Sequence, residues 1–196
     1  MRKISIEELN EKTLLVNLYL TQGITFVLGI LGIYALTPFS ITSLVSANQW
    51  IRDGFLGLGL GILVVFFDLI MMKWLPFSYF DDGGINEKIF KNRTVIHIFT
   101  IAFIVSISEE FFFRGVIQTK FGIWIASLIF TLIHFRYYKK WVLMITLFLI
   151  SMSLGWLYQF TGRLFSPMVA HFVIDFTLGL MIQKNWISSR TNHLSI

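Results

Sequence analysis

The sequence predicts an all-α fold, a polytopic transmembrane helical bundle of about six spans. Hydrophobic residues make up 56% of the chain and charged residues only 14%, and the mean hydropathy is +0.73. These values are far from those of an average soluble domain. Since a transmembrane helix needs ~20 apolar residues, the 196 residues hold about six spans with short connections. We therefore expect a single integral membrane domain over 1–196, with the lipid bilayer as its surroundings.

The spans are predicted from apolar runs that end at polar or turn-forming residues. In chain order the runs cover about 14–36, 54–75, 95–117, a fourth run between Lys120 and Phe135, 141–160, and a sixth run that ends near Ile182. The more polar stretch 41–52 is predicted to lie along the membrane interface, with Trp50 as an aromatic anchor. We interpret the glycines at 54, 57, 59 and 61 as positions of close helix contact. The segment Asp81-Asp82-Gly83-Gly84 predicts a solvated turn.

The distribution of basic residues predicts the orientation of the spans. Twelve Lys and Arg residues lie in the N-terminal segment, the 73–93 and 136–140 segments and the tail, whereas three (Arg52, Lys120 and Arg163) lie in the opposite loops. The positive-inside rule then predicts a multi-pass protein of the cell membrane with both termini in the cytoplasm. Because the basic residues are scattered, the net charge of +5 does not indicate nucleic-acid binding. The absence of cysteine excludes disulfides and a cysteine nucleophile.

Three segments place polar side chains inside the predicted spans, where such residues are rare unless they have a function. They are Glu109-Glu110-Phe111-Phe112-Phe113-Arg114, Phe130-Thr131-Leu132-Ile133-His134 and His171-Phe172-Val173-Ile174-Asp175. Each segment alone could be structural, since intramembrane histidines and ion pairs also join helices. The combination on three spans favours a functional site. Asp68, His97 and His193 have no comparable partners in the sequence, and we interpret them as structural.

The spacing of these side chains predicts a chemistry. Arg114 lies four residues after Glu110, on nearly the same helix face, so the two can form an ion pair that offsets the cost of burial. Glu109 is then left without a cation, and a carboxylate in an apolar site is suited to take a proton from water as a general base. His171 and Asp175 share one helix face about 6 Å apart along the axis. Side chains from three helices can thus converge.

The three segments, in this order and each on its own span, resemble the motifs of the CPBP family, also called Abi. The motifs are Glu-Glu-x-x-x-Arg at 109–114, Phe-x-x-x-His at 130–134 and His-x-x-x-Asp at 171–175, and the resemblance covers about 95–182 as a CAAX-protease-like catalytic core. The family comprises CAAX prenyl endopeptidases and proteins of bacteriocin processing or immunity. The resemblance implies an intramembrane glutamic-type endopeptidase that acts on a peptide or protein substrate.

The resemblance also implies a role for each motif residue. Glu109 would activate the attacking water, His134 would hold and polarise it, and His171 with Asp175 would stabilise the oxyanion. Glu110, Arg114 and Phe130 would support the site. The family was formerly described as metalloproteases, and Glu109, His134, His171 and Asp175 are the residues that would bind zinc. We expect a mechanism without a cofactor, with zinc as the alternative.

The third motif leads to two further predictions, one about the role of Asp175 and one about where the helix of His171 begins. The family often has asparagine where this chain has Asp175, and an ionised aspartate accepts hydrogen bonds but cannot donate one to an oxyanion. Asp175 would therefore be protonated or would orient His171. His171 lies close to the start of the sixth run unless that helix begins near Leu164, so we predict that Pro167 lies in its first turn, where proline is tolerated.

Two other functions are compatible with the sequence. A bacteriocin self-immunity protein would use the same fold without essential proteolysis. A small membrane transporter subunit would use the carboxylates to relay protons or to bind a cation, but it would be expected to have polar residues throughout the membrane thickness. The sequence does not distinguish a prenylated peptide, a bacteriocin leader and a signal peptide as the substrate.

Overall fold

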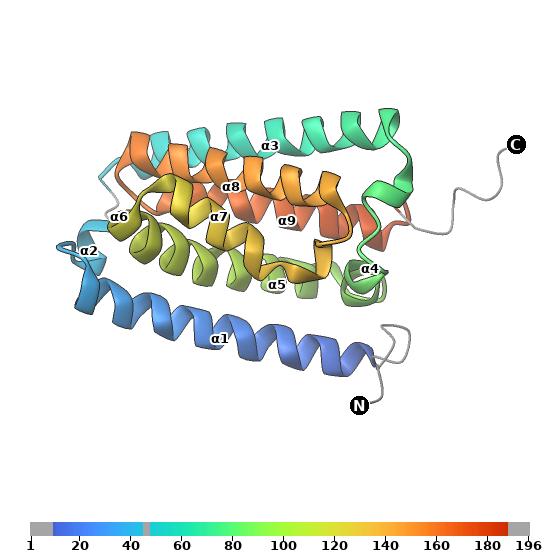
Figure 1. The fold of residues 1–196 in the computed structure, drawn as a ribbon, viewed down its shortest axis with the longest axis horizontal. Helices are drawn as coiled ribbons and strands as arrows, with labels where there is room; N and C mark the ends of the chain where they lie inside the picture. The colour runs from blue at the N-terminus through green and yellow to red at the C-terminus, as the bar shows by residue number, and fades with distance from the viewer. Residues whose placement is uncertain (1–9, 45–47, 188–196) are drawn as a thin grey trace, which may run out of the picture.

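The computed structural model describes residues 10–44 and 48–187, and within these ranges the chain is helical and contains no strand (Figure 1). The α-helices are α1 (Glu11–Leu36), α2 (Ile41–Leu44), α3 (Trp50–Trp74), α4 (Ile85–Phe90), α5 (Val95–Glu110), α6 (Thr119–Phe121), α7 (Ile123–Ile133), α8 (Trp141–Thr161) and α9 (Phe165–Gln183). A π-helical segment over Phe111–Gln118 joins α5 to α6. Short 3-10 helices follow α3 (Phe77–Tyr79) and α7 (Phe135–Tyr137).

Five of the described helices are long and apolar enough to cross a membrane, which confirms the predicted class of a polytopic helical bundle. They are α1, α3, the continuous stretch Val95–Phe121, α8 and α9. The fourth predicted span is shorter than expected, because α7 has only 11 residues. At 1.5 Å per residue it extends about 16 Å, roughly half of the hydrocarbon core.

Two backbone positions set the length of α7. Gly122 has a φ of +86°, a conformation that glycine adopts without strain, and it separates α7 from α6. At the other end His134 has φ −83° and ψ 45°, outside the helical region, and closes the helix. The apolar composition of this run therefore predicted a helix correctly but overestimated its length.

The start of α9 agrees with the expectation for the sixth run. Gly162 ends α8 with a φ of +67°, a left-handed helix end that favours glycine. The next helix begins at Phe165 after Leu164, so Pro167 is its third residue and lies in the first turn. His171 is consequently well inside α9.

The structure changes two expectations for the connecting segments. The predicted stretch 41–52 is divided between two helices, because 50–52 form the first turn of α3 and Ile41–Leu44 form α2. The 81–84 segment is a turn, with φ of +81° at Gly83 and +79° at Gly84. However, the side chains of Asp81 and Asp82 are half-buried rather than solvated, because they face a cavity between the helices.

Helix α9 lies at the centre of the bundle, where it packs against α3, α4, α5 and α8 (Figure 1). Glycines permit the closest of these contacts. A Cβ atom at Gly61 would lie 2.8 Å from the Val173 Cβ, and one at Gly57 would collide with the Ser166 carbonyl oxygen. Gly59, in contrast, has open space around it. The packing interpretation of these glycines therefore holds for Gly57 and Gly61.

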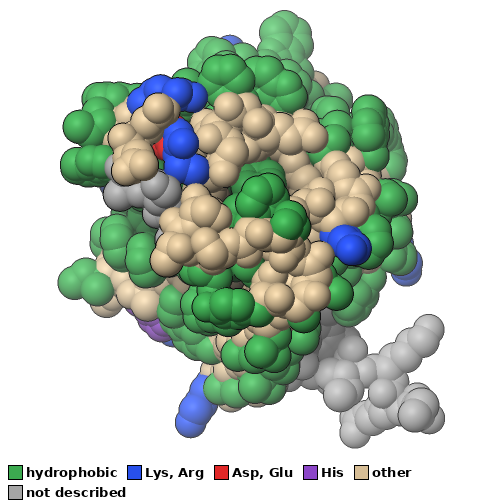
Figure 2. Space-filling model, turned by 90° about the vertical axis from the view of Figure 1, so that its left-hand side faces the viewer, with side chains coloured by type: hydrophobic (Ala, Val, Ile, Leu, Met, Phe, Trp, Pro, Cys, Tyr) green, Lys and Arg blue, Asp and Glu red, His purple; other side chains and the backbone are tan. Residues whose placement is uncertain are grey.

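The two ends of the bundle differ in the segments that they carry. The start of α1, the helix α4, the α7–α8 connection and the end of α9 lie at one end, which we call the α4 end (Figure 1). The opposite α2 end carries α2, α6 and the α8–α9 connection, and Figure 2 shows that uncharged side chains cover most of it. The described parts of the segments predicted to be cytoplasmic thus share the α4 end.

Candidate active site

The first motif lies where α5 changes into the π-helical segment. Glu109 and Glu110 are the last residues of α5 and are 7% and 0% exposed. Arg114 follows within the π-helical stretch and is 0% exposed. Such wider helical turns are frequent at functional sites. Two carboxylates and a guanidinium are thereby held inside the bundle, away from the surrounding apolar exterior.

The predicted ion pair between Glu110 and Arg114 is present. The Arg114 Nε lies 3.0 Å from the Glu110 Oε2, and both side chains are completely buried. Arg114 also donates to the Ser151 hydroxyl of α8 at 3.2 Å, and its guanidinium lies 5.6 Å from the centre of the Phe130 ring. Because these contacts satisfy the guanidinium on several sides, they offset part of the desolvation cost of a buried pair. The pair links α5, α7 and α8.

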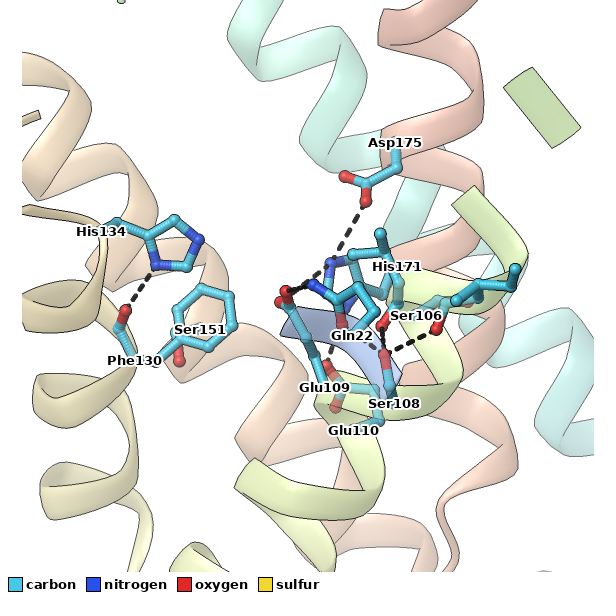
Figure 3. A network of polar contacts seen from close by, with 12 residues as sticks. Gln22, Ser106, Ser108, Glu109, Glu110, Phe130, His134, Ser151, His171 and Asp175 are labelled. Carbon is cyan, nitrogen blue, oxygen red and sulfur yellow. Dashed lines mark hydrogen bonds and ion pairs between the residues drawn. The ribbon is translucent and has the colours of Figure 1, made fainter. Parts of the chain in front are cut away.

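Glu109 is held by a residue outside the three motifs. Its Oε1 accepts a hydrogen bond of 2.8 Å from the Gln22 side chain of α1. The Gln22 oxygen in turn accepts from the Ser108 hydroxyl (Figure 3). The Glu109 Oε2 has no hydrogen-bond partner among the described residues and lies 4.0 Å from the His171 Nε2. One oxygen of the carboxylate is thus fixed, and the other can accept a proton.

His171 is surrounded by carboxylates. Its Nδ1 donates to the Glu110 Oε1 at 2.9 Å, which directs the Nε2 toward two other acids. The Nε2 lies 3.5 Å from the Asp175 Oδ2, one helical turn further along α9, and 4.0 Å from Glu109. Figure 3 shows Asp175 above the imidazole and the two glutamates below it. Glu110 therefore fixes the orientation of the ring.

His134, the residue that follows α7, faces this cluster. Its Nδ1 donates to the Phe130 carbonyl oxygen at 2.7 Å, so the neutral ring carries its lone pair on Nε2. The ring contacts Phe130, with centroids 4.8 Å apart, as expected for a packing residue beside the imidazole. The Phe130 ring also lies 4.9 Å from Phe113 and 6.4 Å from His171. His134 lies across a gap from Glu109 and His171 (Figure 3).

All four residues proposed for catalysis line one cavity. This cavity has a volume of about 560 Å³ and includes Glu109, His134, His171 and Asp175 in its walls, together with Gln22. It lies among α1, α4, α5, α7 and α9 and extends to the α4 end, where residues of α4 line it. The short α7 ends beside it. A second cavity of about 240 Å³, between α3, α4, α8 and α9, shares Phe130, His171 and Asp175 with the first.

The described residues do not form a ready-made metal centre. Across residues 10–44 and 48–187, no group of three or more histidine, aspartate and glutamate side chains is placed to hold a metal ion. The Nδ1 atoms of His171 and His134 donate to Glu110 and to a carbonyl oxygen, an arrangement that is equally compatible with a catalytic and a metal-binding histidine. Glu109 and Asp175 lie beside the His171 Nε2, whereas His134 lies across the gap from these three residues (Figure 3). A mechanism without a metal remains our prediction.

Some residues of the site were not identified from the sequence. Gln22 and Ser151 lie outside the motifs, and only the presence of a polar residue within an apolar run could have indicated them. His97 accepts or donates a hydrogen bond of 2.9 Å with the Tyr19 hydroxyl, in agreement with a structural role. His193 lies outside the described residues. Asp68 is buried and lines the second cavity, a more specific position than the sequence indicated.

Comparison with known proteins agrees with the motifs. A family model described as type II CAAX prenyl endopeptidase Rce1-like matches residues 91–177. An uncharacterized protein of Bacillus subtilis (strain 168), YpbD, is 46% identical to the chain over 127 residues, which cover 65% of this chain and 67% of the relative. No solved structure matches the chain. With its three motifs, its membrane-spanning helices and these similarities, the chain belongs to the CPBP family, in the group described as type II CAAX prenyl endopeptidase Rce1-like.

Proposed function

We propose that the protein is an intramembrane endopeptidase in which Glu109 activates water for hydrolysis of a peptide bond. The family indicates a CAAX protease-type function. The observation that carries the glutamic mechanism is the state of the Glu109 carboxylate. Glu109 is buried in the wall of the larger cavity, and Gln22 donates a hydrogen bond to its Oε1. Its Oε2 has no hydrogen-bond partner among the described residues.

The reaction begins with a water molecule between Glu109 and His134. The lone pair of the His134 Nε2 accepts one hydrogen bond from the water, and Glu109 takes the other proton as the water oxygen attacks the carbonyl carbon of the peptide bond. The carbonyl oxygen becomes an oxyanion in the tetrahedral intermediate. Glu109 then passes its proton to the amide nitrogen, the C–N bond breaks, and the new carboxyl and amino ends leave.

His171 is the donor to the oxyanion in this proposal. Three carboxylates lie within 4.0 Å of its ring nitrogens, an environment that stabilises a doubly protonated imidazole. The Nε2–H can then donate a hydrogen bond to the oxyanion and keep its proton, while the charge of Asp175, 3.5 Å from Nε2, stabilises the imidazolium. An ionised Asp175 has no proton to donate. This division of roles accounts for an aspartate at the position where relatives of the family often have asparagine.

The test is peptide hydrolysis by the purified full chain in lipid nanodiscs, with a mixed peptide library analysed by mass spectrometry. Glu109→Gln removes the base but keeps the shape of the side chain, and we expect a loss of activity of about 10²- to 10⁴-fold. The matched control is Glu11→Gln, which changes a surface carboxylate paired with Arg93 and should leave hydrolysis unchanged. Full activity of Glu109→Gln would exclude the general-base role.

Two further arms separate the alternatives. Activity that is lost with a chelator and restored by zinc would replace the metal-free mechanism by a zinc-dependent one. If the wild-type protein cleaves no peptide but protects cells from a bacteriocin even as Glu109→Ala, the protein is an immunity protein that uses the fold alone.

A further inference from the structure

The smaller cavity beside the proposed active site has an acidic lining. Five of the chain's 11 acidic residues contribute to its wall: Asp68, Asp81, Asp82, Glu87 and Asp175. Among the described side chains no Lys or Arg lines it, although the chain has a net charge of +5. Acidic residues alone do not make a binding site, because Glu87 is paired with Lys91 and Asp81 accepts from the backbone of its own turn. Asp68 differs from them.

Asp68 is a buried carboxylate without a partner. It lies in the membrane-spanning helix α3, is 5% exposed and lines the cavity. Within the described part of the chain it forms no hydrogen bond or ion pair. The other deeply buried carboxylates all have one, since Asp53 pairs with Arg163, Glu110 with Arg114, and Glu109 accepts from Gln22. An unpaired carboxylate in an apolar span costs free energy, which a cationic ligand would offset.

Asp68 lies between the proposed active site and the α4 end of the bundle. Helices α3 and α9 run in the same direction (Figure 1), and Gly61 lies against Ala170 and Val173, next to His171. Asp68 is seven residues further along α3, about 10 Å closer to the α4 end. Asp81 and Asp82 border the same cavity near that end. The carboxylates therefore follow the cavity from its outer part to the proposed oxyanion site.

Most of the remaining wall is apolar, with Asn86, Tyr137, Thr146 and His171 as its polar members. Leu143, Leu147 and Ile150 of α8 face Ile174 and Leu178 of α9 across the cavity. A ligand that fits both features has an aliphatic stem and a cationic end, which is the structure of a lysine or arginine side chain. A purely apolar chain would leave Asp68 buried and unpaired.

We propose that this cavity is a specificity pocket for a lysine or arginine side chain of the peptide substrate, with Asp68 as the counter-ion. The proposal rests on the proposed endopeptidase function. It assigns substrate selection to a residue in α3, outside the three motifs. The basic side chain enters along the apolar wall and places the adjoining backbone next to His171 and Asp175.

The experiment compares two random decapeptide libraries that differ at one fixed central position, lysine in one and norleucine in the other. With the full chain in nanodiscs, we expect the lysine library to be cleaved at least about 10-fold faster, with lysine at a constant distance from the cleaved bond. Asp68→Asn should remove this preference and leave cleavage of the norleucine library within about twofold. Asp68→Glu should retain the preference, and Phe67→Leu, on the exposed face of α3, should behave as wild type.

A binding arm distinguishes failure of the pocket from failure of the proposed reaction. Immobilised Glu109→Gln protein should retain the lysine library at least about 10-fold better than the norleucine library, and the Asp68→Asn/Glu109→Gln double variant should lose this difference. Selective retention without any cleavage by the wild type would support the pocket and contradict the reaction. Equal treatment of both libraries in both arms, or a preference that persists in Asp68→Asn, would overturn the pocket.

Discussion

At the residue scale, the structure connects the proposed base to a helix that the motifs do not include. Gln22 donates to Glu109 and accepts from Ser108, so both ends of its amide are used. A hydrogen bond to a charged group contributes about 1.5–3 kcal/mol, and here it also selects which carboxylate oxygen faces the cavity. Gln22 is therefore a positioning residue for Glu109.

Replacement of Gln22 should reduce turnover more than binding. In Gln22→Met, Glu109 loses its fixed orientation, and we expect kcat to fall by about 10- to 100-fold, which corresponds to 1.4–2.7 kcal/mol, with KM within about twofold. Steady-state hydrolysis of a peptide taken from the cleaved library measures both constants. Leu20→Met, on the exposed face of α1, is the matched control. A rise in KM with normal kcat would assign Gln22 to substrate binding, and a large fall in the melting temperature would assign it to stability.

The sequence alone was enough to predict the contacts between site residues that lie on the same helix. The Glu110–Arg114 pair and the His171–Asp175 contact follow from a spacing of four residues. Gln22 and Glu109 are 87 residues apart, and their contact depends on how α1 packs against α5, which a single sequence does not contain. The same holds for Asp68, whose importance depends on the cavity that α3 forms with α8 and α9.

At the element scale, hydropathy predicted where helices lie better than where they end. The apolar run before His134 has the composition of a complete span, yet α7 covers only 11 residues because backbone conformations at Gly122 and His134 terminate it. The shortened helix leaves room for the cavity that His134 lines. The start of α9 was predictable because proline is accepted only in the first turn of a helix.

The contact between α3 and α9 depends on Gly57 and Gly61, where an added methyl group would clash with α9, whereas Gly59 has open space around it. In Gly57→Ala the new methyl group would collide with the Ser166 carbonyl and lie 2.8 Å from the Val169 Cβ. We expect a loss of about 1–3 kcal/mol in the free energy of unfolding, as for other overpacked sites. The measurement is unfolding of the purified protein in mixed micelles with increasing denaturing detergent.

Gly59→Ala is the internal control for this contact, since nothing lies within 4 Å of the added Cβ. Its stability should equal that of the wild type or rise slightly, because alanine has the higher helix propensity. Equal destabilisation by both substitutions would show that helix propensity or lipid contact, rather than the packing of α3 on α9, determines the effect.

At the scale of the whole molecule, the fold places the two sets of basic residues that predicted the orientation at opposite ends of the bundle. Lys73 in the last turn of α3, Lys88 of α4, and Lys139 and Lys140 before α8 lie at the α4 end, whereas Arg52, Lys120 and Arg163 lie at the α2 end. Both cavities reach the α4 end. If the positive-inside rule holds for this chain, the substrate reaches the site from the cytoplasmic side, and the acidic cavity faces cytoplasmic peptides.

Cysteine labelling can test this orientation without background, because the chain contains no cysteine. Lys120→Cys places a thiol on the exposed link at the α2 end and Lys139→Cys places one in the exposed connection at the α4 end. In intact cells, a membrane-impermeant maleimide should label Lys120→Cys and leave Lys139→Cys unlabelled until the membrane is permeabilised. The unmodified protein should remain unlabelled under both conditions. The reverse pattern would place the α4 end outside the cytoplasm, and the proposed substrates would then have to be extracytoplasmic peptides, since both cavities extend to that end.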